Sequence, residues 1–456
     1  MHEASPIDRG VSAADSAILS PILGDAQIGA LFSDTAYVAA MAQFEVALAR
    51  AQAHCGVIPA GAAIAIAERA VGFRADLDAM GAGTAASAVP TIELVKQMRA
   101  HIALDDAAYL HWGATSQDVI DTALVLRLAT VVDIFEARLR ALMQQMVRQV
   151  EAHRATVMPA RTRYQQALPT SLALKLASWL APLPRQLTRL RELRPRLLVV
   201  QFGGAAGTSA ALGDKGVAVM EQLAIELELF CPEMHWHSQR DNVVEFANWA
   251  SVLTGVLGKL GQDIALHQQS EFGELRESSD LSRGGSSTMP QKANPIGAEA
   301  MVALARFNAG MVANMHQAMV QENERGGPGW QLEWMTLPQM LVATGASLRH
   351  AQAFANDLVA DPVRMRANLA DGQGLIMAEA FSFALALHMP RPEAQALVKS
   401  ACRVALSENR ELVEVLRQLT DAPVDWAAVA DPLEYLGVAD QFIDRVLTST
   451  ERVLTY

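Results

Sequence analysis

The sequence has 456 residues, of which 19% are charged, and its formal net charge at pH 7 is −12. Such a chain is long enough for two or three domains with a large core. The negative charge and the lack of a basic patch argue against nucleic-acid binding, so we expect no nucleic-acid partner. Aromatic residues make up only 5%. Alanine, leucine, valine and methionine are abundant instead, which favours helices over sheets.

Three cysteines, Cys55, Cys231 and Cys402, lie far apart in the sequence. They provide neither a disulfide framework nor the ligand spacing of a zinc site, which fits a reducing cytoplasm. The first ten residues carry charges and no apolar core, so they do not read as a secretory signal. No uninterrupted apolar run reaches transmembrane length. We therefore expect a cytoplasmic protein without a membrane partner.

A first helix is predicted over residues 33–55. Ser33 or Asp34 can cap its start, because short polar side chains accept hydrogen bonds from the first free amides of a helix. Gly56 and Pro59 mark its end. A run with several glycines and a proline follows this helix.

Four series of apolar residues at spacings of three and four predict long helices in the middle of the chain, and such helices form an elongated bundle. The methionines among them are expected to fill gaps in the core. The series are Leu124, Leu128, Val131, Phe135, Leu139, Leu142 and Met146; Leu172, Leu176, Trp179, Leu183, Leu187 and Leu190; Val252, Val256, Leu260 and Ile264; and Leu304, Phe307, Met311, Met315 and Met319.

The helical pattern shortens toward the C-terminus, where Gly372 and Gly374 interrupt it. We therefore predict an all-α protein with three helical domains over residues 1–111, 112–365 and 366–456. Many apolar positions of the central helices recur on more than one face. A helix that is apolar on several faces is buried on several faces. We expect the central domain to pack against copies of itself.

The most informative segment spans residues 284–295 and reads GGSSTMPQKANP. The two glycines free the backbone, and the two prolines stop it from continuing as a helix. We expect a loop that can move and then lock. Considered alone, a run rich in glycine and serine also fits a solvated linker.

Three side chains of this segment carry chemistry. Ser286 is a potential proton carrier, Lys292 is a cation and Asn294 is a neutral hydrogen-bonding group. These are the parts needed to move a proton at a carbon next to a carboxylate, and to hold the negative charge that builds on that carboxylate. We predict that all three are catalytic.

A second segment, residues 111–118, reads HWGATSQD and precedes the first long central helix. Thr115, Ser116 or Asp118 can cap that helix, and its first amides would then face an anion. Capping alone also accounts for these residue types. His111 fits a structural histidine as well as an anion-binding one.

Residues 203–208 read GGAAGT, a glycine-rich turn similar to a phosphate loop. No lysine follows at the P-loop position, so we do not expect nucleotide binding. We predict a tight break between two long helices that supports the site.

The segment GSSTMPQKANP resembles the signature loop of the fumarase/aspartase superfamily, which includes fumarases, aspartases, argininosuccinate and adenylosuccinate lyases and carboxymuconate cycloisomerases. The segments HWGATSQD and GGAAGT resemble two further stretches of this superfamily. The runs ERGGPGWQLEW at 324–334 and LEYLG at 433–437 look like the cycloisomerase branch. The resemblance spans nearly the whole chain and is weakest in the first thirty residues and the third domain. It implies a homotetramer with a multi-helix core and active sites shared between subunits.

The run ARTRYQQALP at residues 160–169 departs from the superfamily pattern. Related lyases usually read R-T-H-x-Q there, and the resemblance implies that their histidine helps to protonate the leaving group. Arg163 stands in its place. Arginine stays protonated and does not relay protons at neutral pH, but it can bind a carboxylate with two hydrogen bonds. Arg163 also fits a surface or salt-bridge residue.

This departure favours one chemistry. Amine, guanidinium and hydroxide leaving groups need a proton as they depart, whereas a carboxylate, whose acid has a pKa of about 4, does not. Lactone formation adds a substrate's own carboxylate across a conjugated double bond, so it needs a carbon acid/base and anion-binding groups but no such histidine. The departure therefore favours the cycloisomerase branch. The resemblance to that branch implies an intramolecular lyase that lactonises a carboxymuconate in aromatic catabolism. A lyase releasing fumarate and a non-catalytic helical scaffold are the alternatives.

The expected substrate is a small polycarboxylate, held without a cofactor or a metal. The residues predicted to bind its carboxylates are His111, Thr115, Ser116, Arg163 and Arg325.

Overall fold

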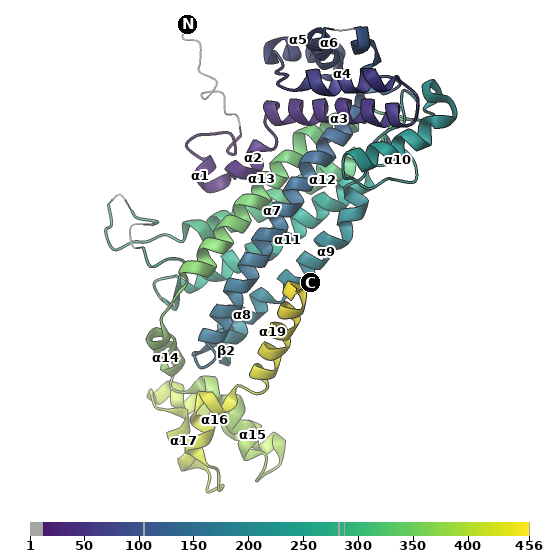
Figure 1. Cartoon of the computed structure of the whole chain (residues 1–456). Coiled ribbons are helices and arrows are strands. Elements are labelled where there is room, and N and C mark those ends of the chain that lie inside the picture. Colours follow the sequence, from purple (N-terminus) through teal and green to yellow (C-terminus); the bar gives the residue numbers. More distant parts are fainter. Residues whose placement is uncertain (1–11, 104, 281–282, 287, 456) are drawn as a thin grey trace. The chain divides into compact units, whose positions relative to one another are not determined.

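The structure is a computed structural model that describes residues 12–103, 105–280, 283–286 and 288–455. Helices dominate it, which confirms the predicted all-α class (Figure 1). In the described part of the chain, the strands form two small two-stranded antiparallel sheets, β1–β2 and β3–β4.

The elements in chain order are α1 (Ser20–Leu23), α2 (Ala26–Ala30), α3 (Asp34–His54), α4 (Ala60–Ala70), α5 (Leu77–Ser87), α6 (Thr91–Ile102), η2 (Asp105–Tyr109), α7 (Ser116–Ala152), β1 (Val157–Thr162), β2 (Gln165–Ser171), α8 (Leu172–Leu180), α9 (Pro182–Leu197), η3 (Ala210–Lys215), α10 (Gly216–Glu226), α11 (Asp241–His267), β3 (Leu275–Arg276), α12 (Ile296–Ala318), α13 (Pro328–Asp357), β4 (Val359–Ala360), α14 (Pro362–Ala370), η4 (Leu375–Met377), α15 (Ala378–Leu385), α16 (Arg391–Glu408), α17 (Leu412–Leu419), α18 (Trp426–Ala430), η5 (Pro432–Tyr435) and α19 (Ala439–Thr455).

The chain forms two compact units. The first consists of the chain up to Arg138, Gln186–Gly255 and Ala303–Arg349, and the second of Leu139–Arg185, Val256–Val302 and the chain from His350 onward. The helices α7, α9, α11, α12 and α13 contribute residues to both units. The division into three domains stays a prediction.

The predicted first helix is present as α3. The Ser33 hydroxyl accepts a hydrogen bond from the Ala36 amide at 3.3 Å, as an N-cap residue does. The helix ends at His54, and Gly56 follows it with a φ of +67°, a left-handed conformation that glycine adopts without strain. Local residue chemistry therefore defines both ends of α3.

The long helices bury most of the predicted apolar series. Six of the seven members on α7 are completely buried, from Leu128 to Met146. The second series is wrong in one respect, because it is divided between α8 and α9, and the new helix begins at Pro182. In the third series Val252 is 50% exposed, since the buried stripe of α11 runs through Leu253 and Leu257 instead.

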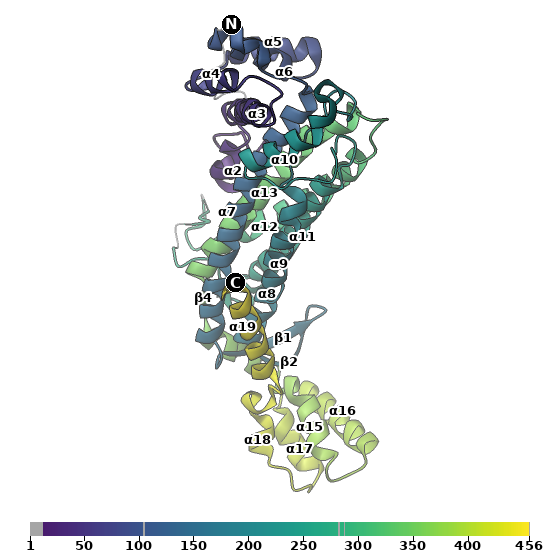
Figure 2. The ribbon, with the colours of Figure 1, turned by 45° about the vertical axis from the view of Figure 1, so that its right-hand side comes forward.

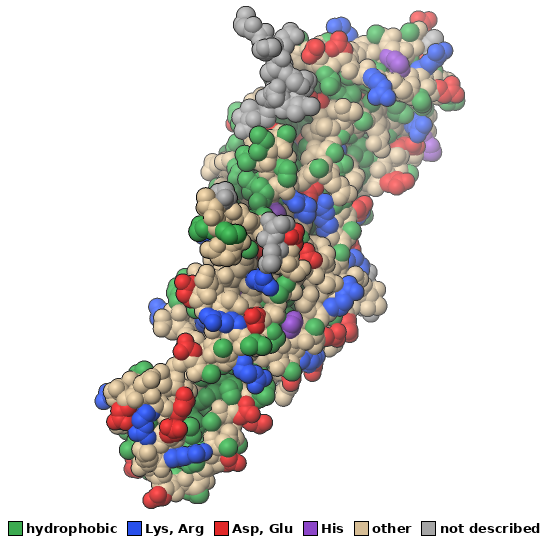
Figure 3. Space-filling view, turned by 90° about the vertical axis from the view of Figure 1, so that its left-hand side faces the viewer, with side chains coloured by type: hydrophobic (Ala, Val, Ile, Leu, Met, Phe, Trp, Pro, Cys, Tyr) green, Lys and Arg blue, Asp and Glu red, His purple; other side chains and the backbone are tan. Residues whose placement is uncertain are grey.

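Each unit has its own apolar core. In the first unit, α3 packs with α4, α6, α10 and the start of α7. In the second unit, a cluster built mainly by α15, α16 and α17 also includes Val157 of β1. The β1–β2 hairpin extends to one side of the helices of this unit (Figure 2). On the face drawn in Figure 3, basic and acidic side chains are interspersed.

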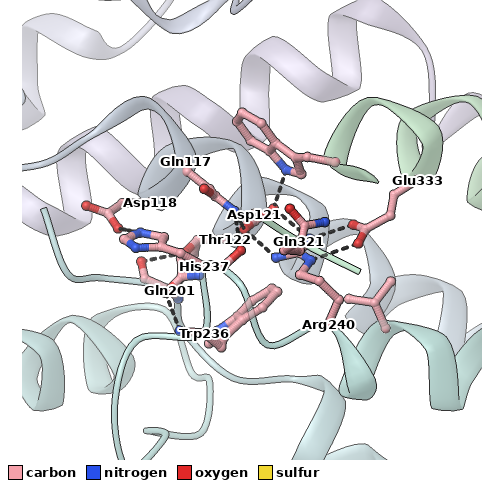
Figure 4. Close-up of polar contacts among 12 residues, drawn as sticks. Gln117, Asp118, Asp121, Thr122, Gln201, Trp236, His237, Arg240, Gln321 and Glu333 are labelled. Atoms are coloured by element: carbon pink, nitrogen blue, oxygen red, sulfur yellow. Dashed lines mark hydrogen bonds and ion pairs between the residues drawn. The ribbon is translucent and has the colours of Figure 1, made fainter. Parts of the chain in front are cut away.

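A buried ion network ties together three segments of the first unit (Figure 4). The guanidinium of Arg240, just before α11, donates to both oxygens of Asp121 on α7 at 2.7 and 3.1 Å, and to both oxygens of Glu333 on α13 at 2.8 and 2.6 Å. Trp330 donates to Asp121 at 2.9 Å. The three charged side chains are at most 1% exposed. Their charges therefore depend on one another for stabilisation.

We expect Arg240→Met to destabilise the protein by about 3–5 kcal/mol, because removing one partner leaves two buried carboxylates without their cation. Arg196→Met is the matched control. Arg196 also donates two hydrogen bonds to a carboxylate, that of Glu245, but their side chains are 56% and 43% exposed, so its loss is expected to cost under about 1 kcal/mol. Urea unfolding followed by circular dichroism measures both, and equal destabilisation by the two substitutions would contradict the prediction.

Candidate active site

Asp118 organises the segment 111–118 from its C-terminal end. Its buried carboxylate accepts hydrogen bonds from the amides of Thr115, Gly203 and Gly204, each at 3.0 Å. The Nε2 atom of His237 lies 2.7 Å from the same carboxylate (Figure 4). One acidic side chain thus joins the turn before α7 to the glycine-rich turn and to a buried histidine.

The two turns approach each other backbone to backbone, which explains the glycines. Gly204 has a φ of +71°, and a Cβ atom there would lie 2.9 Å from the carbonyl oxygen of Gly113. A Cβ on Gly203 would lie 2.7 Å from the side chain of His235. The segment GGAAGT is therefore a turn, as predicted, but it lies between α9 and the short 3-10 helix η3 and not between two long helices. It packs against the turn that precedes Thr115.

The other end of the segment is held by α3. The Nδ1 atom of His111 lies 2.6 Å from the Glu45 carboxylate, and Gln52 donates to the carbonyl of Trp112 at 2.6 Å. His111 has a φ of +61°, so these contacts hold it in a left-handed conformation. Burial lowers the pKa of His111, but the Glu45 carboxylate and its hydrogen bond outweigh burial, and the pKa is raised above its ordinary value.

The predicted anion-binding residues of the first unit share this region. Ser116 is the first residue of α7, and Thr115 precedes it. The amide of Thr115 donates to Asp118 three residues later, one half of a capping box. The exposed Arg325 donates to the Thr115 hydroxyl, so a cation lies beside the first turn of α7. Capping and anion binding are compatible here, because Asp118 engages the amide of Thr115, and the hydroxyl protons of Thr115 and Ser116 are left for other partners.

The loop at 284–295 lies in the second unit and has a defined geometry. An antiparallel bridge pairs Gly285 with Ala293, and the amide of Asn294 donates to the carbonyl of Gly284 at 2.8 Å. Gly284 has a φ of +74°, and a Cβ there would lie 2.1 Å from the backbone oxygen of Asn294. This closed loop therefore requires glycine at position 284. Ser287 lies outside the described residues.

Within this loop, the half-buried Ser286 hydroxyl accepts hydrogen bonds from the amides of Thr288 and Met289, at 3.4 and 3.3 Å. Its own proton is left for another partner. The Asn294 side chain is half-buried, and the Lys292 side chain is exposed. No described contact joins Lys292 to Ser286.

Glu277 holds the point where the loop enters α12. Its buried carboxylate accepts from the amides of Gly297 and Ala298, at 3.0 and 2.9 Å, and lies 3.4 Å from the guanidinium of Arg283. Gln268, which directly follows α11, donates a hydrogen bond of 3.0 Å to the carbonyl of Ala293. The loop is thus tied on both sides, while Lys292 between these anchors remains exposed.

Arg163 lies at the tip of the β1–β2 hairpin, with a φ of +49° and an exposed side chain. It does not contact the loop at 284–295 in the described part of the chain. The hairpin is anchored by Arg161 instead, which binds both oxygens of the fully buried Glu274 at 2.7 and 2.8 Å. His267 lies 2.6 Å from Glu274, and Asn368 donates to it at 2.8 Å.

The candidate residues therefore fall into two groups. His111, Thr115, Ser116 and Arg325 lie together in the first unit. The second unit holds the other four, with Ser286, Lys292 and Asn294 on one loop and Arg163 on the hairpin. Among the described residues, no group of three or more histidine, cysteine, aspartate or glutamate side chains is placed to hold a metal ion.

Sequence reasoning missed the buried carboxylates that hold these segments. Glu45 offered a signal, because it interrupts the apolar series of α3 at a position that helical spacing places in the core. Glu274 and Glu277 stand in an ordinary polar stretch before the loop. His237 lies 119 residues from its partner Asp118, and no local pattern relates the two.

Comparison with known proteins defines the class. Residues 25–307 match the family model described as lyase, and residues 374–446 match the model described as adenylosuccinate lyase C-terminus. The chain therefore belongs to the lyase family of the fumarase/aspartase superfamily.

Several relatives that match nearly the whole chain carry the name of one enzyme. The chain is 42% identical to 3-carboxy-cis,cis-muconate cycloisomerase of Bradyrhizobium diazoefficiens, over 97% of this chain and 100% of that protein. It is 41% identical to the enzyme of the same name from Pseudomonas aeruginosa, over 92% of this chain and 94% of that protein. The crystal structure of 3-carboxy-cis,cis-muconate lactonizing enzyme from Pseudomonas putida is similar with a TM-score of 0.90 and 40% identity, covering 95% and 98% of the two chains.

The Glu274 cluster predicts a pH dependence of stability. Burial raises the pKa of Glu274, but its bonds with His267, Arg161 and Asn368 outweigh burial and lower it from 4.5 to about 2. A lowered carboxyl pKa stabilises the folded state above pH 4.5, and that stability is lost as the pH falls toward 2. We expect Glu274→Gln to lower stability at pH 7 and to reduce its decline between pH 5 and 3.

Urea midpoints of the wild type and of Glu274→Gln, taken at pH 7, 5, 4 and 3, measure this dependence. Glu408→Gln is the control, because the carboxylate of Glu408 is exposed and bound to Arg410. Its urea midpoints should change with pH as those of the wild type do. If the urea midpoints of the wild type and of Glu274→Gln fell by the same amount between pH 5 and 3, the lowered pKa of Glu274 would be contradicted.

Proposed function

We propose that the protein lactonises 3-carboxy-cis,cis-muconate to 4-carboxymuconolactone, a step in the breakdown of aromatic compounds such as protocatechuate. An oxygen of one substrate carboxylate forms a C–O bond with a carbon of the conjugated diene. The displaced π electrons move to the neighbouring carbon and into the carboxylate attached to it, and that carbon then takes one proton. No atom leaves and no redox change occurs, so the reaction is an isomerisation by an intramolecular lyase.

The side chains take complementary roles in this reaction. Ser286 is the carbon acid/base, because its hydroxyl accepts two backbone bonds and keeps its proton for transfer. Lys292 and Asn294 stabilise the enolate-like carboxylate and bias Ser286 toward proton transfer. His111, Thr115, Ser116, Arg163 and Arg325 bind the substrate carboxylates. No residue in this scheme requires a cofactor.

Arg163 is the observation that favours lactonisation over elimination of a basic leaving group. It stands where related lyases carry a proton-transferring histidine, and its exposed guanidinium has no carboxylate partner among the described residues. It is suited to binding an anion and unsuited to protonating a leaving group. The names of the relatives that match over nine-tenths of both chains support the same assignment.

The test is to incubate the purified protein separately with 3-carboxy-cis,cis-muconate, adenylosuccinate and argininosuccinate, and to follow each by ultraviolet absorbance. We expect loss of the conjugated diene with the first substrate and no fumarate from the other two. Efficient fumarate release would reassign the protein to the lyase alternative. No turnover of any of the three, by protein that is folded by circular dichroism, would favour the non-catalytic scaffold.

Ser286→Ala should lower kcat by about 10²–10⁴-fold, the usual contribution of a general acid or base, with substrate binding changed by no more than several-fold. Ser278→Ala is the control, since the Ser278 hydroxyl also accepts a backbone bond, from Asp280 at 3.1 Å, and has no role in the reaction proposed here. Steady-state and single-turnover kinetics measure both variants. A Ser286→Ala enzyme with more than half the wild-type rate of chemistry would exclude Ser286 as the proton carrier.

Arg163→Ala should chiefly raise KM for carboxymuconate, by an amount that corresponds to about 1.5–3 kcal/mol for a lost charge-assisted contact. Arg163→Lys should recover only part of the loss, because lysine keeps the charge without the two-pronged geometry. Arg163→His should not improve lactonisation. Unchanged kcat and KM in Arg163→Ala would make the residue structural.

We also propose a homotetramer that shares active sites between subunits and works in the cytoplasm. Large apolar side chains of the first unit are exposed on three long helices, among them Val252, Phe307 and Met335, at 50%, 41% and 67%. α12 is also long and apolar enough to cross a membrane by length and composition, a property that core helices of bundles share. The three cysteines are free thiols, which suits a reducing compartment. An active monomer in sedimentation would contradict the tetramer.

A further inference from the structure

The buried carboxylate of Glu45 has His111 as its one hydrogen-bond partner among the described residues. Glu45 lies on α3 among core residues and is 0% exposed. Its Oε1 atom contacts His111 at 2.6 Å, while its Oε2 atom is buried without a partner among the described residues. A carboxylate removed from water without a cation is strongly destabilised. The histidine is the one partner the described structure gives it, so the pair is stable as carboxylate and imidazolium.

His111 is positioned to use its second nitrogen. The backbone on both sides of the ring is tethered, because Arg99 on α6 donates to the carbonyl of Leu110 at 2.9 Å and Gln52 donates to that of Trp112. The side chain is 19% exposed, and Nε2 has no hydrogen-bond partner among the described residues. A protonated ring held by Nδ1 therefore presents a donor at Nε2, four residues before Thr115.

The charges that face the ring come from three helices. Glu45 of α3 and Asp118 of α7 are negative and favour the imidazolium, and Arg99 of α6 is positive and opposes it. Asp118 is already engaged with three amides and His237. Glu45 is the carboxylate in direct contact, so it determines the charge of His111.

We propose that Glu45 is a positioning residue that maintains His111 as an imidazolium, so that Nε2 donates a charged hydrogen bond to a carboxylate of the substrate. The substrate part of this inference rests on the proposed function. The charge of His111 in the free protein does not. In an acidic protein that binds a polyanion, a buried carboxylate thus creates a positive charge at the surface where Thr115 and Arg325 lie.

The first experiment needs no substrate. The protein is labelled with 13C at Cε1 of histidine, the His111 signal is assigned with His111→Asn, and its titration is followed by NMR in wild type, Glu45→Gln and Gln52→Met. We expect the pKa of the wild-type His111 to lie above its ordinary value of about 6.5, because Glu45 outweighs burial. In Glu45→Gln we expect it to lie below that ordinary value, because burial then dominates. Gln52→Met removes a neighbouring bond from the same helix without removing a charge, so it should keep the high value.

The second experiment measures KM for 3-carboxy-cis,cis-muconate at pH 7.5 and 6.0. At pH 7.5 a histidine with a pKa of about 6.5 or lower is at most about one-tenth charged, so Glu45→Gln should raise KM several-fold or more, with a smaller effect on kcat. At pH 6.0 a larger fraction of His111 is charged in the variant, so the ratio of its KM to that of the wild type should be smaller than at pH 7.5. A purely structural role for Glu45 would raise KM equally at both pH values.

The outcomes separate the two proposals. A wild-type His111 that titrates near or below 6.5, or a Glu45→Gln protein with an unchanged titration, overturns the inference whatever the substrate is. If Glu45→Gln does not fold, the wild-type titration alone decides. A raised pKa of His111 in the wild type that is lost in Glu45→Gln supports the charged pair of Glu45 and His111. If carboxymuconate is then not turned over, the proposed function fails, but the charged pair is still supported. Turnover with a KM for Glu45→Gln equal to that of the wild type overturns the substrate contact.

Discussion

A carboxylate that is removed from water must collect hydrogen-bond donors and cations, and this requirement shapes three of the segments that carry candidate site residues: 111–118, the loop at 284–295 and the β1–β2 hairpin. Asp118 collects three amides and a histidine from turns about 85 residues apart in the sequence. Glu277 and Glu274 do the same for the signature loop and for the hairpin of the second unit. Each acid exchanges the hydration it loses for contacts that fix a backbone segment.

This arrangement also reconciles an acidic protein with an anionic substrate. Several of the acids that contribute to the net charge of −12 are internal and paired. The exposed cations proposed to bind the substrate, Arg163, Lys292 and Arg325, have no carboxylate partner in the part of the chain that the structure describes. Internal pairing of the acids therefore leaves these cations available, and the burial of Glu45 extends the same principle by making His111 a further cation.

Much of the fold followed from the sequence because its causes are local. The cap at Ser33 and the stop at Gly56 depend on neighbouring residues, and the stripe of α7 depends on a spacing of three and four. The break before Pro182 was missed because leucines continue at helical spacing across it. The face of α11 was misplaced by one residue at Val252, since valines and leucines alternate there and only packing decides which of them is buried.

The candidate site was predictable only in part, for the same reason. Ser286, Lys292 and Asn294 stand within nine residues, and their order in the chain was sufficient to identify them as candidates. The acids that support the site have partners that are remote in sequence, as Glu45 is from His111, and only the fold brings them together. Arg163 could be identified from the sequence because it departs from the superfamily pattern. The sequence did not indicate that Arg161, two residues earlier, would bind the buried carboxylate of Glu274.

The central claim is that an intramolecular carboxylate adds to a double bond and that the enzyme delivers one proton to the adjacent carbon. The most direct measurement is the NMR spectrum of the product formed from 3-carboxy-cis,cis-muconate in deuterated water. The account predicts 4-carboxymuconolactone with one deuterium on the carbon next to the one that forms the new C–O bond. The reason is that a serine hydroxyl exchanges its proton with the solvent before it transfers it. Absence of the lactone, or a lactone without deuterium at that carbon, would contradict it.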